Sequence, residues 1–96
     1  MELLITYDVS TTDAAGVKRL RKVAKICEAN GQRVQDSVFE CTLNAVQKEK
    51  FVHKLSEIID KDEDSLRIYR LLQPREKYVE ELGRELELDL HDPLVL

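Results

Sequence analysis

The 96-residue sequence predicts an α+β fold of the ferredoxin-like type, with the element order β-α-β-β-α-β. Three observations lead to this prediction. Short apolar segments of strand length alternate with two longer segments of helical periodicity. Polar turn residues separate these segments, and Pro74 follows the last of the strand-like ones. In such a fold two helices cover one face of an antiparallel sheet, and the other face needs a cover of its own.

The first strand is predicted at Glu2–Asp8, where apolar side chains occupy both faces. This pattern is typical of a central strand that is covered on both sides. Residues 10–13 form a polar connector with candidates for the N-cap of a helix. That helix is predicted for Ala14–Asn30, and Gly31 ends it. Its apolar side consists of Val17, Leu20, Val23, Ala24 and Cys27.

The middle of the chain predicts a strand pair and a second helix. Residues 32–43 are strand-like, and a turn at Asp36-Ser37 divides them into Gln32–Gln35 and Ser37–Leu43. Asn44 is the expected N-cap of a helix from Ala45 to Asp60. Its apolar stripe consists of Phe51, Val52, Leu55, Ile58 and Ile59. A charged loop, residues 61–64, leads to the last strand, Ser65–Leu72.

The C-terminal segment, residues 74–96, belongs to the same single domain, residues 1–96. Tyr78–Leu82 is a candidate for a short edge strand. Leu88–Leu96 ends on apolar residues, whereas free termini are usually polar. We therefore expect residues 74–96 to dock across a dimer or onto a partner. The apolar second face of the sheet predicts packing against another copy of the chain.

The composition excludes several classes of protein. No apolar run approaches the roughly 20 residues of a membrane span, and the N-terminus lacks a signal peptide pattern. These features predict a cytoplasmic protein without membrane contact. Cys27 and Cys41 form no CxxC motif and are expected to be buried, reduced thiols. His53 and His91 are expected at the surface, and a Gly-rich phosphate loop is absent from the sequence.

Charge is unevenly distributed along this acidic chain, whose net charge is −4. Cations gather between Gly16 and Arg33, where Glu28 is the one acid. They are Lys18, Arg19, Arg21, Lys22, Lys25 and Arg33. Such a surface has two interpretations, an ordinary solvated helix face and a contact surface for phosphates that does not read sequence. The local field permits the second interpretation, because it acts within a Debye length of about 8–10 Å.

Asp8 also has two interpretations. It is either a turn-forming residue at the end of a strand or the one metal ligand that the chain offers. Mg²⁺ prefers carboxylate oxygens, but a single carboxylate makes a poor site. A two-fold axis would bring the Asp8 carboxylates of two copies together, and the pair could then share one ion.

Three segments of the sequence jointly resemble one known family. They are residues 5–9 (ITYDV), residues 18–23 (KRLRKV) and residues 31–40 (GQRVQDSVFE). They are similar to the small CRISPR-associated protein of the spacer-acquisition machinery, the Cas-two family. The resemblance extends from the N-terminus through Leu72, and it implies a ferredoxin-like homodimer.

The resemblance also implies functional residues. Asp8 matches the catalytic, metal-binding aspartate at the dimer interface, where Mg²⁺ or Mn²⁺ is the cofactor. Arg19, Arg21 and Arg33 resemble nucleic-acid-facing positions, and Lys18 and Lys22 are expected to bind nucleic acid as part of the same basic surface. Phe39 matches a position near the active cleft.

Two functions follow from these correspondences. The first is a metal-dependent endonuclease that cleaves single-stranded RNA or double-stranded DNA with water as the nucleophile. The second is a non-catalytic scaffold that bridges two integrase (Cas-one) dimers during insertion of new spacers into the CRISPR array. A ligand-binding regulatory domain is a third, weaker hypothesis, because the chain has a basic helix and no second domain.

Overall fold

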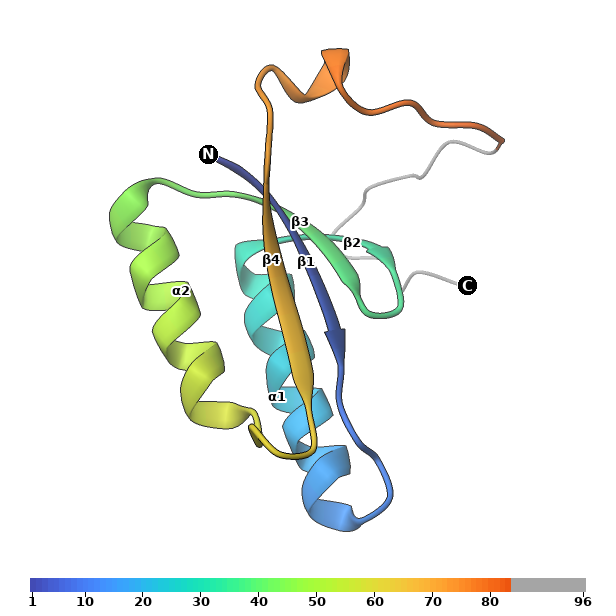
Figure 1. Cartoon of the computed structure of the whole chain (residues 1–96), viewed down its shortest axis with the longest axis vertical. Coiled ribbons are helices and arrows are strands. Elements are labelled where there is room, and N and C mark those ends of the chain that lie inside the picture. Colours follow the sequence, from blue (N-terminus) through green and yellow to red (C-terminus); the bar gives the residue numbers. More distant parts are fainter. Residues whose placement is uncertain (84–96) are drawn as a thin grey trace.

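The computed structural model describes residues 1–83, so His91 and the docking predicted for Leu88–Leu96 lie outside the described residues. Its sheet has four antiparallel strands in the order β2-β3-β1-β4 (Figure 1). The strands are β1 (Glu2–Asp8), β2 (Gly31–Gln35), β3 (Val38–Thr42) and β4 (Ser65–Leu71). The helices are α1 (Ala14–Asn30) and α2 (Ala45–Ile58), and a 3-10 turn, η1 (Arg75–Lys77), follows β4. This arrangement confirms the predicted ferredoxin-like fold.

The core lies between the sheet and the two helices. Alternate residues of β1, which are Leu3, Ile5 and Tyr7, are buried and face the helices. The other buried core residues are Val9, Val23, Cys27, Phe39, Cys41, Leu43, Phe51 and Leu55. Since β1 pairs with both β3 and β4, it is the central strand that the sequence predicts.

The opposite face of the sheet, which we call the open face, carries the remaining residues of β1. Alternation places Leu4, Thr6 and Asp8 on this face. The buried residues of both helices belong to the core, so within residues 1–83 neither helix covers the open face. Tyr69 of β4 lies opposite Leu4 and is 44% exposed. The open face is therefore partly apolar, and the described part of the chain provides no helix that covers it.

Local hydrogen bonds explain where the helices begin. The Asp13 carboxylate accepts a hydrogen bond of 2.7 Å from the Gly16 amide and caps α1. Asn44 caps α2 in a reciprocal arrangement with Gln47, in which each side chain accepts from the other residue's amide. Both starts were predicted from the sequence. Among residues 1–83, neither helix is long and apolar enough to cross a membrane.

The end of α2 differs from the prediction. The helix ends at Ile58 and not at Asp60, because Ile59 is extended and the Asp60 amide donates to the Asp64 carboxylate. Val52, predicted in the apolar stripe, is 38% exposed and so does not belong to it. Phe51 and Leu55 of that stripe are buried as expected.

The segment after β4 also differs from the prediction. β4 ends at Leu71, one residue before the predicted end, and Leu72 is 66% exposed. Tyr78–Leu82 is not a strand. The amides of Tyr78 and Val79 donate to the Arg75 carbonyl at 2.9 and 3.0 Å, which continues the turn of η1 and prevents an extended start. In Figure 1 this segment leads away from the end of β4.

Candidate functional site

Asp8 is the last residue of β1 and pairs with Ser65, the first residue of β4. Its side chain is exposed. Among residues 1–83, no ion pair involves Asp8 and no three metal-ligating side chains gather into a cluster. Within residues 1–83, the end of β1 therefore presents one free carboxylate, and a second copy of the chain could supply another oxygen ligand for Mg²⁺.

Arg67 is the cation of β4 that shares the open face with Asp8. It pairs with Thr6, so it is a diagonal neighbour of Asp8 across the two strands. Such neighbours lie about 7–8 Å apart, within reach of a long side chain. Arg67 Nη1 donates to the Tyr69 hydroxyl at 3.1 Å, and this hydrogen bond raises the pKa of Arg67. Sequence reasoning missed Arg67, because its position beside Asp8 depends on the strand register.

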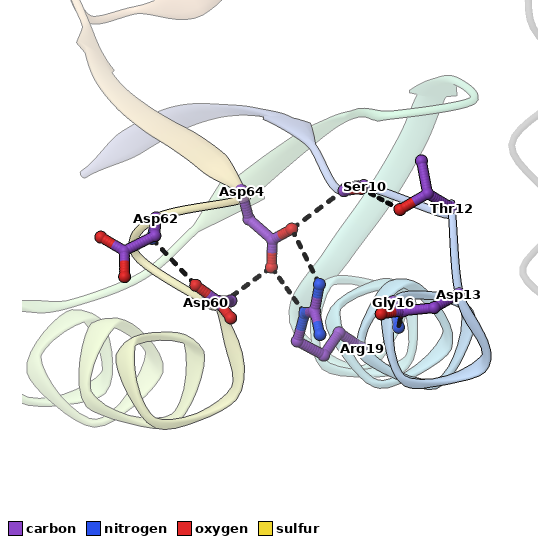
Figure 2. Close-up of polar contacts among 8 residues, drawn as sticks. All are labelled: Ser10, Thr12, Asp13, Gly16, Arg19, Asp60, Asp62 and Asp64. Carbon is purple, nitrogen blue, oxygen red and sulfur yellow. Dashed lines mark hydrogen bonds and ion pairs between the residues drawn. The ribbon is translucent and has the colours of Figure 1, made fainter.

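A second aspartate, Asp64, lies just before β4 and organises the loops at the same end of the sheet. Its side chain is 0% exposed. Ser10 and Asp60 donate their backbone amides to it at 3.0 and 2.9 Å. Arg19 donates Nε at 2.8 Å and Nη2 at 3.4 Å. We call these residues the Asp64 junction; Figure 2 shows that it joins the β1–α1 loop, α1 and the α2–β4 loop.

The Asp64 junction holds its central carboxylate in the charged form. Burial alone would raise the pKa of Asp64, but hydrogen bonds from Arg19, Asp60 and Ser10 lower it below the ordinary value of 3.8. The hydrogen bond to Asp64 in turn raises the pKa of Arg19. The two side chains therefore form an ion pair at neutral pH. The sequence predicts a charged loop at residues 61–64, but the role of Asp64 depends on Arg19 and Ser10, which are distant in the sequence.

The structure separates the predicted nucleic-acid-binding cations into groups. On α1 the side chains of Lys18, Arg21, Lys22 and Lys25 are exposed, and no ion pair among residues 1–83 involves them. Arg19 is different, since its side chain is 18% exposed and is bound to Asp64. The exposed cations form a continuous basic surface on α1 that can hold a phosphate backbone.

Arg33 and Phe39 face each other across β2 and β3 on the helix side of the sheet. The Arg33 guanidinium lies 5.1 Å from the centre of the Phe39 ring, and its Nη2 forms a 3.0 Å ion pair with Glu28. Phe39 is 0% exposed and stacks on Tyr7 with ring centres 6.2 Å apart. Phe39 is thus a core residue beneath the strand end that carries Asp8, and any effect on the site must pass through packing.

The thiols and His53 do not form a nucleophilic site. Burial raises the pKa of Cys27 to about 12 and that of Cys41 to about 11, so both remain protonated and unreactive. Both cysteines are free and buried, as the sequence predicts. His53 is exposed on α2, where Nε2 lies 2.7 Å from the Glu57 carboxylate.

A groove of about 330 Å³ lies at the other end of β1 from Asp8, with Glu2 in its wall. Glu40 and Arg75 also line it and form an ion pair of 2.8 Å. This ion pair joins η1 to β3. The groove is therefore separate from the strand end that carries Asp8.

Comparison with known proteins adds family relationships to this geometry. Residues 1–79 match the family described as CRISPR associated protein Cas2, which is the Cas-two family that the three sequence segments resemble. The CRISPR-associated endoribonuclease Cas2 1 of Moorella thermoacetica is 57% identical over 96 residues, covering 100% of both chains. The CRISPR-associated endonuclease Cas2 of Halalkalibacterium halodurans is 50% identical over 95 residues, covering 99% of both chains.

Solved structures of similar fold were also found. The crystal structure of Streptococcus pyogenes Cas2 at pH 6.5 superposes with a TM-score of 0.77 at 49% identity, covering 86% of this chain and 100% of that one. A hypothetical protein from Thermus thermophilus superposes with a TM-score of 0.72 at 31% identity, covering 92% of this chain and 96% of that one. The structure from Streptococcus pyogenes therefore carries the same family name as the sequence relatives.

Proposed function

The chain belongs to the Cas2 family of CRISPR-associated proteins, and on this premise we propose that it is a homodimeric, metal-dependent endonuclease of CRISPR adaptation. The observation that carries this proposal is the exposed carboxylate of Asp8, which no cation neutralises within residues 1–83. The names of the two relatives differ between endoribonuclease and endonuclease. The proposed substrate class is accordingly the phosphodiester of single-stranded RNA or double-stranded DNA.

The proposed cofactor is Mg²⁺, or Mn²⁺ in its place, held between the Asp8 carboxylates of two copies. Carboxylate oxygens are suitable donors for either ion. One chain supplies half of such a site, so the fit depends on a dimer. When bound, the ion supplies positive charge to the reacting phosphodiester and makes a nearby water more acidic. Asp8 would hold the ion at the strand end.

The open face of the sheet is the proposed dimer interface. Leu4 and Leu71 contribute apolar surface to it, and Tyr69 is 44% exposed there. Burial of such a surface favours association. A two-fold axis near the end of β1 would place the two Asp8 carboxylates together.

The basic surface of α1 is the proposed contact for nucleic acid. Its exposed side chains would bind phosphates without reading the base sequence. Arg33 would extend this surface only through the part of its guanidinium that Glu28 and Phe39 leave free. The proposed location is the cytoplasm, where the buried thiols of Cys27 and Cys41 remain reduced.

A scaffold without catalysis is the second candidate function. In this role the dimer bridges two integrase (Cas-one) dimers, and residues 74–96 contact the integrase. One observation favours it. Within residues 1–83, Asp8 is the one exposed carboxylate at the end of β1, whereas four exposed cations lie on α1, so the residues needed to bind phosphates are more complete than those needed for catalysis.

Substitution of Asp8 by alanine distinguishes the two functions. Cleavage of RNA and of duplex DNA is measured with Mg²⁺ on the purified protein, and spacer acquisition is measured in cells. A catalytic Asp8 predicts loss of cleavage. Unchanged cleavage would show that the catalytic assignment is wrong. Loss of cleavage with normal acquisition would assign the biological role to the scaffold.

A further inference from the structure

The carboxylate of Asp64 is unusually well satisfied for a loop residue. Oδ1 accepts from the Ser10 amide at 3.0 Å and from Arg19 Nη2 at 3.4 Å. Oδ2 accepts from Arg19 Nε at 2.8 Å and from the Asp60 amide at 2.9 Å. Since the side chain is 0% exposed, water cannot replace these donors.

The Asp64 junction lies next to the strand end that carries Asp8. Asp64 directly precedes Ser65, which pairs with Asp8, and Ser10 follows Asp8 by two residues. One carboxylate thus ties together the chain that leaves β1 and the chain that enters β4 (Figure 2). Asp8 lies between these two segments, since it precedes Ser10 by two residues and pairs with Ser65.

The β1–α1 loop is also packed closely against the first turn of α1. A Cβ atom at Gly16 would collide with the carbonyl oxygen of Ser10. The Ser10 and Thr12 hydroxyls lie 3.2 Å apart, and Asp13 caps the helix. The loop after Asp8 therefore has little room to adopt another path while Asp64 holds Ser10.

The Arg19 side chain is held in the Asp64 junction. Its side chain is 18% exposed and donates through both Nε and Nη2 to Asp64. To reach a phosphate fully, Arg19 would leave a buried carboxylate without its cation, which is strongly unfavourable. Arg21, two residues further along α1, is exposed and forms no ion pair among residues 1–83.

We propose that Asp64 is a positioning residue that fixes the β1–α1 loop and thereby orients Asp8, and that Arg19 acts through Asp64 and not by contacting nucleic acid. The part that concerns Asp8 rests on the proposed metal-dependent function. The part that concerns Arg19 is independent of catalysis.

The first test compares Arg19→Gln with Arg21→Gln in the full-length protein. The dissociation constant for duplex DNA is measured against salt concentration without divalent metal. Loss of one phosphate contact lowers the slope of log K against log salt by about 1. We expect the slope to decrease by about 1 for Arg21→Gln and to stay at the wild-type value for Arg19→Gln. An equal decrease in both variants would overturn the assignment of Arg19.

The second test uses cleavage kinetics of Arg19→Gln, Asp64→Asn and the double variant. Displacement of a catalytic group by about 1 Å can reduce a rate by about 100-fold. We expect kcat to fall by about 10- to 100-fold in each single variant, with KM nearly unchanged. The double variant should be no slower than the slower single variant, because both changes act on one junction. Multiplied losses, or wild-type kcat, would contradict the proposal.

Two controls keep these results interpretable. Arg19→Gln and Asp64→Asn each leave one partner of the ion pair without the other and can fail to fold, whereas the double variant has no buried unpaired charge. Where a single variant does not fold, the double variant replaces it in both tests, with the wild-type salt slope and the same fall in kcat as the expected results. If Asp8→Asn cleaves like wild type, the proposed catalytic function fails, but the salt slopes still show where Arg19 acts.

Discussion

The carboxylates of Asp8 and Asp64 lie at the same end of the sheet but in opposite surroundings. Asp64 is enclosed, accepts hydrogen bonds from Ser10, Arg19 and Asp60, and carries a lowered pKa. Asp8 is exposed, and no cation pairs with it within residues 1–83. Ser65 separates them, since it follows Asp64 in the chain and pairs with Asp8 across the sheet.

The two surroundings suit one residue type to two different purposes. A carboxylate whose oxygens are fully occupied stabilises loops and has no lone pairs free for a ligand. A carboxylate without partners contributes little to stability but can bind a cation.

The substitution Asp8→Asn should have the largest effect, and it tests whether Asp8 serves cleavage and not stability. We predict that Mg²⁺-dependent cleavage falls by about 100-fold or more, because the proposed metal loses its charged ligand. The free energy of unfolding should change by less than about 0.5 kcal/mol, since exposed side chains without partners contribute little. Cleavage assays and urea unfolding check both expectations. A marked loss of stability with retained cleavage would assign Asp8 a structural role.

In contrast to Asp8→Asn, the substitution Asp64→Asn should lower the stability of the protein markedly. The amide cannot supply the negative charge that Arg19 faces, and one of its atoms is a donor. We predict a decrease in Tm on the order of 10 °C. Asp62→Asn is the matched control in the same loop, because the Asp62 side chain is exposed and lies outside the junction. Equal Tm values for the two variants would contradict the structural role of Asp64.

The contribution of the Asp64 junction to stability should depend on pH. Because the pKa of Asp64 is lowered below 3.8 in the folded state, its contribution to stability is present above about pH 4 and is lost as pH falls through the folded pKa. We predict that the unfolding free energy of Asp64→Asn falls less steeply than that of wild type between about pH 5 and pH 2. Urea unfolding at several pH values measures this slope. Parallel curves would count against the ion pair.

The smallest predicted effects concern single cations on α1. Lys22→Gln should weaken duplex DNA binding severalfold at low salt and lower the salt slope by about 1. Its Tm should stay close to that of wild type, because the side chain is exposed and forms no ion pair among residues 1–83. Fluorescence anisotropy over a salt series provides the measurement. An unchanged slope would exclude Lys22 from the nucleic-acid surface.

Most of the fold could be predicted because its signals are local. A short segment with apolar residues on both faces predicts β1, and helical periodicity predicts α1 and α2. The caps at Asp13 and Asn44 act on amides three residues ahead, so sequence spacing reveals them. The end of α2 was misplaced because the Asp60 amide bonds to a side chain of the next loop, which helix periodicity cannot indicate.

The candidate site could be predicted only in part. Asp8 was identified because an acid at the tip of an apolar strand is conspicuous within the segment ITYDV. Asp64 was missed because its partners Arg19 and Ser10 lie 45 and 54 residues away in the sequence. For the same reason, Arg19 was grouped with the exposed cations of α1. Only the folded chain shows which arginine has a buried partner.

A titration with Mn²⁺, followed by calorimetry on the full-length protein, tests the role of Asp8 most directly. We predict one ion for every two chains in the wild type, no binding in Asp8→Asn and weaker binding in Asp64→Asn. One ion per chain, or binding that survives in Asp8→Asn, would contradict a metal site shared between two copies of Asp8.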